Sequence, residues 1–337
     1  MGENSPAGGS VIGRIIAYFA NAPNLLGICC VVGAVMVFAT QDMLVKWLSD
    51  GYPLHQIVFT RAVVGITILL LVIVPLEGGY RILKSKHLPL HLLRGLAVVM
   101  ANMSFFLSLA SVPLADAVAM FYIAPLLITL LSIPLLGEKV GIRRLSAVIV
   151  GLVGVVVMVQ PGSAEFQLAA LLPLAAAFFY ALLSIMTRKI GIRDKASTMA
   201  FYVQITFVFV GGAFGVIAGD GQYAGGGNPQ LEFLLRAWVW PTQSDLLLMV
   251  LIGVLSGAGA YMISQGYRLA EAATAAPFEY TSLPLSVFWS IVIFSEIPGV
   301  NTWIGIVLIC GSGLYVFYRE SVRGKKVASA RPMPRNR

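Results

Sequence analysis

Residues 114–138 have the sequence LADAVAMFYIAPLLITLLSIPLLGE, in which no charged residue stands between Asp116 and Glu138. An apolar run of this length suffices for an α-helix to cross the roughly 30 Å hydrocarbon core of a bilayer. Similar runs, bounded by charge, glycine or proline, recur along the chain. The sequence therefore predicts an all-α membrane protein with ten transmembrane helices, at approximately 25–48, 54–75, 92–111, 114–136, 145–160, 168–186, 199–218, 246–267, 272–294 and 303–318.

The composition supports a membrane environment. Of the 337 residues, 58% are hydrophobic and 11% are charged, whereas about 25% are charged in an ordinary soluble domain. The formal net charge of +8 comes from short loops and a basic tail, without a basic stripe that alternates with stacking aromatics, so nucleic acid is not an expected partner. The three cysteines lack the spacing of a metal site or a disulfide framework, and no cofactor is expected.

The distribution of basic residues predicts the orientation, because lysine and arginine are retained on the cytoplasmic side of a membrane. With ten spans and a cytoplasmic N-terminus, all but three of the 23 basic residues lie in cytoplasmic segments. We therefore expect a multi-pass inner-membrane protein with both termini in the cytoplasm. Residues 1–24 are expected to be a cytoplasmic segment, not a cleaved signal peptide, and residues 319–337 a basic cytoplasmic tail.

The two halves of the chain share a succession of residues: an alanine-rich entry, a proline within a span, and a glutamate after a small residue. The positions are Ala110, Ala115, Pro125 and Gly137-Glu138 in the first half, and Ala270, Ala275, Pro284 and Ser295-Glu296 in the second. Because each half would contain five spans, an odd number, the second copy must be inverted relative to the first. We expect repeats at 25–160 and 161–318 that enclose a central cavity, a plan that recurs in secondary transporters.

This paired motif in a ten-span chain resembles the EamA branch of the drug/metabolite transporter superfamily, and the resemblance covers residues 25 to 318. Membership implies two inverted five-helix repeats around a cavity and alternating access to it from the two sides of the membrane. The second copy departs from the family pattern at Ser295, where glycine is frequent, which puts the packing at that helix end in question. Members include exporters of amino acids and other metabolites and uptake systems for riboflavin or S-adenosylmethionine, and no motif selects among them.

Few charged residues lie within the predicted spans, where a charge costs about 2.5–3.5 kcal/mol on insertion scales and therefore indicates a function. The candidates are Asp42, Lys46, Arg61 and Glu279. Asp42 and Arg61 fall at similar depth in the first two spans. They form either a structural salt bridge or a site in which Arg61 anchors a carboxylate or phosphate. Helix breaks are expected at Pro284 and at its counterpart in the fourth span, Pro125. Glu279 lies beside the first of these, where it binds a substrate ammonium or a coupling proton, or else pairs with Arg268.

Two further expectations concern the outer side of the membrane. Lys46 is expected to extend its ammonium to the membrane surface. The long connection 220–245 is expected to lie at that surface, with Trp238 and Trp240 at the level of the headgroups and a role as a lid as the alternative.

Polar and aromatic side chains at helical spacing are the other candidates for the cavity wall. Such residues also hold membrane helices together, which is the alternative for each of them. A mixed aromatic and amide lining suits a planar or zwitterionic solute. The full set of expected substrate-binding residues is Phe38, Gln41, Asp42, Arg61, Asn102, Phe105, Phe106, Tyr122, Tyr180, Ser184, Tyr261, Gln265, Glu279 and Tyr280.

The favoured function is secondary transport of a small organic metabolite such as an amino acid or a related zwitterionic or planar compound. The alternative is uptake of a vitamin or a nucleoside-like compound. An intramembrane enzyme is disfavoured because no HExxH, GxSxG or Walker A motif occurs. The expected partners are the small-molecule substrate, the lipid bilayer and a second copy of the chain, since spans five and ten carry small residues and almost no polar ones, which suits scaffold or dimer contacts.

Overall fold

The structure is a computed structural model that describes residues 23–85, 88–137, 140–162, 167–190, 196–269 and 276–322. Every regular element within these ranges is helical. In chain order they are α2 (Pro23–Leu48), α3 (Leu54–Ile68), the π-helix η1 (Leu69–Ile73), α4 (Val74–Leu76), the short 3₁₀ helix η2 (Tyr80–Leu83), α5 (Leu88–Ser108), α6 (Leu114–Phe121), α7 (Ala124–Leu136), α8 (Ile142–Val159), η3 (Leu168–Ala170), α9 (Leu171–Ile190), α10 (Ala196–Ala218), α11 (Pro229–Leu235), α12 (Gln243–Leu269), η4 (Ala276–Thr281), α14 (Ser282–Phe294) and α15 (Val300–Val322).

Eight segments of the described chain are long and apolar enough to cross a membrane. Two shorter apolar segments, Phe278–Phe294 and Val300–Val316, follow them. Large apolar side chains such as Leu71, Val216 and Val307 are exposed on the surface of the bundle, as expected for helices that face lipid. The prediction of an all-α membrane protein is confirmed, and ten spans are compatible with this arrangement.

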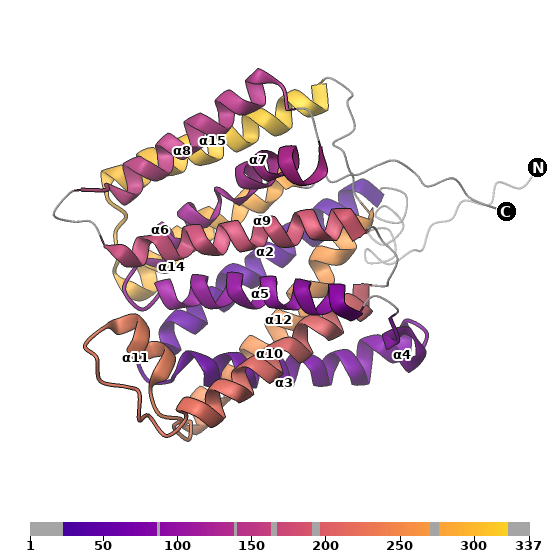
Figure 1. The fold of residues 1–337 in the computed structure, drawn as a ribbon, viewed down its shortest axis with the longest axis vertical. Helices are drawn as coiled ribbons and strands as arrows, with labels where there is room; N and C mark the ends of the chain where they lie inside the picture. Colours follow the sequence, from indigo (N-terminus) through magenta and orange to yellow (C-terminus); the bar gives the residue numbers. More distant parts are fainter. Residues whose placement is uncertain are drawn as a thin grey trace, which may run out of the picture.

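The helices form one bundle in which distant parts of the chain lie side by side (Figure 1). Helices α8 and α15 pair along one edge, and α3 pairs with α10 along the opposite edge. Between these edges, α2 packs against α12 and α14, and α9 packs against α5 and α7. We call the two ends of the bundle the α11 end and the α4 end, after the short helices that lie there in Figure 1.

Two of the spans are broken, and each break lies beside a proline. Helix α6 ends at Phe121, and α7 begins at Ala124 with Pro125 in its first turn. In the second half, the 3₁₀ helix η4 gives way to α14 two residues before Pro284. Proline lacks an amide hydrogen and fits the first turn of a helix, where that hydrogen has no intrahelical partner. The predicted breaks are therefore confirmed, whereas Ala270, Ala275 and Glu138 of the paired motif lie outside the described residues.

The helices α7 and α14 end in the same way despite their different residues. Gly137 has a φ of 69° and Ser295 a φ of 56°, both in the left-handed region. In each case the backbone N–H of this residue donates to a carbonyl four residues earlier, that of Ile133 or Ile291. The doubt about this helix end is therefore resolved, because the serine accepts the conformation for which glycine is favoured.

The left-handed conformation costs a residue with a Cβ about 1 kcal/mol. We therefore expect Ser295→Gly to raise the free energy of unfolding by about this amount, since Ser295 is exposed and its side chain makes no hydrogen bond to the described part of the chain. The matched change, Gly137→Ala, should lower it by a similar amount. Thermal melts of the purified protein in detergent measure both, and an unchanged midpoint for Ser295→Gly would contradict the assignment of strain.

The connection between α10 and α12 covers the α11 end. Phe233 of α11 is only 1% exposed, and Arg236 donates to two backbone carbonyls just after α2. Trp240 is 92% exposed, as expected for a residue at headgroup level, but Trp238 packs its ring against His55 and Phe59 of α3. Trp238 is 37% exposed, so these ring contacts leave its expected position at headgroup level a prediction.

Candidate substrate-binding site

A cavity of about 360 Å³ lies at the centre of the bundle. Its wall includes residues of α2, α3, η1, α5, α6, α7, α9, α10, α12, η4 and α14, so both halves of the chain contribute. None of the described residues of α8 and α15 belongs to the wall. The cavity reaches the α4 end at Ile73, Ser197 and Ala200, which lie at the last turn of η1 and the first turns of α10.

Most of the predicted site residues line this cavity, and three do not. The lining residues among them are Phe38, Gln41, Asp42, Arg61, Asn102, Phe105, Phe106, Tyr122, Tyr180, Tyr261 and Glu279. Ser184 and Gln265 lie one turn beyond Tyr180 and Tyr261, and their side chains donate to the Tyr180 carbonyl and the Tyr261 hydroxyl. Tyr280 lies behind the wall, where its ring packs against Tyr122 at 5.0 Å between centroids.

Arg61 carries a buried charge in the deep part of the cavity, away from the α4 end. Its side chain is 3% exposed, and its guanidinium lies over the rings of Phe106 at 5.3 Å and Phe207 at 4.8 Å. Such cation–π contacts partly replace the water that the charge has lost. The edge of the guanidinium is still available to bind a ligand, since its buried Nε atom has no hydrogen-bond partner.

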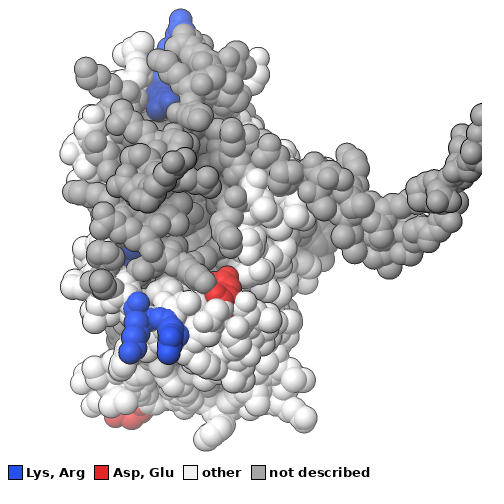
Figure 2. Space-filling model, turned by 90° about the vertical axis from the view of Figure 1, so that its right-hand side faces the viewer, with Lys and Arg blue, Asp and Glu red and all other residues white. Residues whose placement is uncertain are grey.

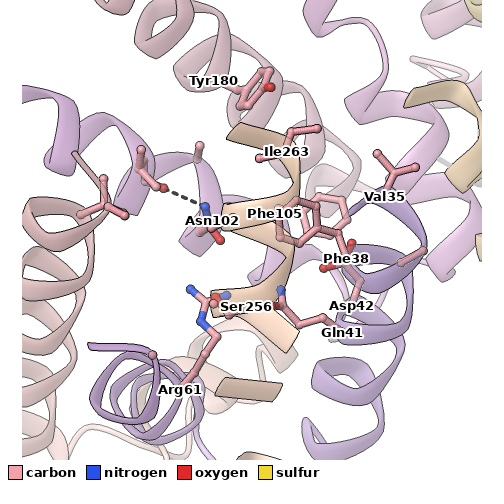
Figure 3. A pocket seen from close by; sticks show the side chains of 18 of the residues that line it. Val35, Phe38, Gln41, Asp42, Arg61, Asn102, Phe105, Tyr180, Ser256 and Ile263 are labelled. Atoms are coloured by element: carbon pink, nitrogen blue, oxygen red, sulfur yellow. Dashed lines mark hydrogen bonds between the residues drawn. The ribbon is translucent and has the colours of Figure 1, made fainter. Parts of the chain in front are cut away.

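Asp42 and Arg61 face the same cavity without touching (Figure 3). No ion pair within 4.0 Å joins them, so the direct salt bridge, one of the two alternatives for Asp42 and Arg61, is absent in this structure. The Oε1 atom of Gln41, the residue before Asp42, is buried without a hydrogen-bond partner.

The deep part of the cavity thus offers polar groups that need a ligand or water as a hydrogen-bond partner. Arg61 has an unpaired donor, and Gln41 and Ser286 have buried side-chain oxygens without a partner. An unsatisfied buried polar group costs about 1–3 kcal/mol. Figure 3 shows Arg61, Gln41 and Asn102 pointing their polar ends toward the same space. A bound molecule with both donors and acceptors at one edge would recover this energy.

The remainder of the wall is largely apolar and includes a cluster of aromatic rings. Phe105, Phe121 and Tyr180 form a chain of edge-to-face contacts, with centroids 5.6 and 5.4 Å apart. Phe38 and Phe106 extend this surface on the neighbouring helices. Aromatic faces and edges of this kind bind a planar ring better than they bind a flexible aliphatic chain.

The two helix breaks meet beside the cavity. The Tyr122 hydroxyl, at the end of α6, donates to the backbone carbonyl of Glu279 at 2.8 Å and contacts the Ser282 hydroxyl at 2.5 Å. This contact joins the broken spans of the two halves and places Glu279 in the wall. The side chain of Arg268, the alternative partner of Glu279, lies outside the described residues.

Several wall residues were not anticipated. Apart from Phe121 and the aliphatic, glycine and proline residues, they are Ser197, Gln204 and Phe207 on α10, Ser256 on α12, and Ser282 and Ser286 on α14. Ser282, Ser286 and Ser290 recur every four residues in an apolar span, and this spacing could have identified the polar face of α14.

Lys46 does not reach the membrane surface, so that prediction was wrong. Its side chain is 8% exposed, and its Nζ lies 2.6 and 2.7 Å from the two carboxylate oxygens of Glu296. Nζ also donates to the Val112 carbonyl, while Glu296 accepts from the Leu114 amide and the Ser290 hydroxyl. A partner 250 positions away in the sequence stabilises the charge inside the protein.

An apolar helical bundle with a central cavity that holds both buried charges and aromatic rings defines a membrane carrier for a small organic molecule. Residues 25–160 and 167–318 each match the EamA-like transporter family, and the chain belongs to this family. It is a multi-pass membrane protein that transports a small molecule.

Characterised relatives cover most of the chain. It is 28% identical over 307 residues to a riboflavin transporter of Vibrio cholerae, which covers 90% of this chain and 96% of the relative. It is 25% identical to an S-adenosylmethionine uptake transporter of Rickettsia prowazekii, over 88% of this chain and 94% of the relative. A pseudopaline exporter of Pseudomonas aeruginosa is 26% identical, over 84% of this chain and 93% of the relative.

A solved crystal structure has the same fold. Its TM-score is 0.59 with 19% sequence identity, and the match covers 90% of this chain and 99% of the other.

Proposed function

We propose that this protein is a secondary transporter that carries a planar heteroaromatic metabolite, of the flavin or adenine-nucleoside class, through the inner membrane. The observation that carries the proposal is the cavity wall, which combines aromatic rings with unpaired polar groups in its deep part. Two relatives, a riboflavin transporter and an S-adenosylmethionine uptake transporter, carry compounds of this class, which supports the proposal. The vitamin- or nucleoside-like substrate therefore ranks above an amino acid.

The cavity also has a suitable size. Pockets for compounds of this class enclose about 300–1,000 Å³ and are mostly apolar, with a few polar groups that fix the orientation of the ligand. The volume of about 360 Å³ lies within this range. A small amino acid would leave most of the aromatic wall without contacts.

The proposed mechanism is alternating access by two inverted repeats, α2–α8 and α9–α15, at 25–160 and 161–318. The packing supports this symmetry, because α2 packs against α12 and α14 while α9, its counterpart, packs against α5 and α7. Likewise α3 packs against α12, and its counterpart α10 packs against α5. The matching caps at Gly137 and Ser295 close helices that end at opposite ends of the bundle (Figure 1).

The proposed orientation places the α4 end in the cytoplasm. Arg81, Lys84 and Arg143 are exposed there, and Figure 2 views this end with its basic side chains in blue. Because positive charge is retained on the cytoplasmic side, the proposal has the α11 end outside and both termini in the cytoplasm.

Uptake into proteoliposomes tests the proposed substrate class. We expect saturable, protein-dependent uptake of labelled riboflavin or S-adenosylmethionine. Unlabelled flavins or adenine nucleosides should compete with it, whereas glycine and lysine should not. If amino acids were taken up saturably and neither riboflavin nor S-adenosylmethionine were taken up, the amino-acid alternative would be established instead.

Glu279 is proposed to bind the coupling proton. One proton moving down a potential of 100 mV supplies about 2.3 kcal/mol, which corresponds to roughly fifty-fold accumulation of a neutral solute. We expect Glu279→Gln to reduce accumulation to about the external concentration while exchange of labelled for unlabelled substrate continues. Glu232→Gln, on the short helix α11, is the control. Accumulation by Glu279→Gln at the wild-type level would contradict this role.

A further inference from the structure

The Lys46–Glu296 ion pair joins the two halves of the chain at the α11 end. Lys46 lies in the last turn of α2, and Glu296 follows the end of α14 by two residues. Both partners also bind the beginning of α6, through the Val112 carbonyl and the Leu114 amide. The Nζ atom of Lys46 also lies over the Phe294 ring, 4.9 Å from its centroid. Three separate segments therefore depend on one pair of charges.

The pair lies directly beyond the cavity. Lys46 follows the cavity residue Asp42 by four positions on α2, which is about one helical turn or 6 Å. On α14, Ser286 lines the cavity, and Ser290, one turn further, donates to the Glu296 carboxylate. The cavity wall thus ends where the pair begins. In the opposite direction the cavity continues to Ile73 and Ser197 at the α4 end.

We propose that Lys46 and Glu296 form the outer gate of the transporter, closed in this structure, and that the pair separates when the cavity opens toward the α11 end. The inference rests on the alternating-access mechanism proposed above. A carrier that rocks its halves must separate contacts between them on the outer side. An ion pair suits this task, because its atoms meet in one geometry and their attraction falls steeply once water enters between them.

The burial of the pair makes it a strong closure. Lys46 is almost entirely buried, and each charge has further hydrogen bonds to backbone or side-chain groups. Removing one partner of such a pair leaves the other charge buried and uncompensated. The closed state then loses stability, whereas an open state hydrates the remaining charge. A variant without the pair should therefore populate the outward-open state.

A cysteine reporter in the cavity tests the gate without any substrate. In a background with Cys29, Cys30 and Cys310 replaced by alanine, Ser286→Cys places a thiol in the cavity wall. A membrane-impermeant maleimide is then added outside intact cells. We expect slow labelling in this parent and labelling at least about tenfold faster when Glu296→Gln is added. In everted vesicles, labelling of the same thiol from the cytoplasmic side should fall.

The charge swap separates the ion pair from general packing. Lys46→Glu combined with Glu296→Lys restores the pair and should return most of the slow external labelling, and it also shows that the altered region still folds. Asp220→Asn, an exposed acid at the same end, should label like the parent. The proposal would be overturned if the Glu296→Gln variant were labelled as slowly as the parent. It would also be overturned if labelling were fast and the charge swap did not slow it again. Because no substrate is needed, the gate can be present even if neither tested ring compound is carried.

Discussion

Replacing Arg61 with alanine lowers saturable substrate uptake by about ten- to one-hundred-fold. The reason is that the guanidinium is held between two rings with an unpaired donor in the cavity wall. A hydrogen bond from a charged group contributes about 1.5–3 kcal/mol, and this range corresponds to the stated loss. Initial rates in proteoliposomes, taken over a range of substrate concentrations, measure the effect as a fall in the ratio of maximal rate to KM.

Two variants show whether the loss belongs to the cavity. Arg61→Lys keeps the charge but not the planar fork, so it should recover only part of the uptake. Arg81→Ala removes an arginine exposed at the α4 end and should transport at the wild-type rate. Each preparation must first elute as a single species in size-exclusion chromatography. Uptake by Arg61→Ala equal to wild type, in a folded protein, would remove Arg61 from the site.

Substituting Gly154 with leucine is the second change with a large expected effect. A Cβ at this position would lie 2.9 Å from Leu308 Cβ and 3.2 Å from the Gly305 carbonyl oxygen, so α8 and α15 could not keep their spacing. Small residues permit such close approach of membrane helices. We expect the free energy of unfolding to fall by about 3 kcal/mol or more. The yield of monodisperse protein and its melting midpoint in detergent measure this loss.

The same pair of helices offers a matched control. Gly311 on α15 has nothing within 4 Å of an added Cβ, and it is exposed. Gly311→Leu should therefore melt close to wild type. Equal melting of the Gly154 and Gly311 variants would show that the α8–α15 contact is not limited by the size of residue 154.

Part of the candidate site could be predicted because it depends on helical periodicity alone. Gln41 and Asp42 on α2, and Asn102 and Phe105 on α5, stand on single faces of apolar helices. A polar face on a membrane helix turns away from lipid, and these residues do line the cavity. Tyr280 shows the limit of this reasoning. It follows Glu279 in η4, but its side chain lies on the other side of the wall.

Contacts between distant segments could not be predicted in the same way. Lys46 appeared to be a charge near a helix end, and the membrane surface was the nearest polar environment in the sequence. Its partner Glu296 is adjacent only after α2 and α14 have packed together. Gln204 and Phe207 likewise enter the wall because α10 packs against α3 and α5.

The sequence by itself determined that this protein is helical and crosses a membrane, because hydrocarbon leaves a backbone no hydrogen-bond partners except its own. It also determined where two spans break, since the missing amide of proline acts locally at Pro125 and Pro284. Only the tertiary structure decided which charges meet. Asp42 and Arg61 remain apart across the cavity, while Lys46 reaches Glu296. Hydrogen bonds and ion pairs act over a few ångströms, so the packing of whole helices selects the groups that come within this range.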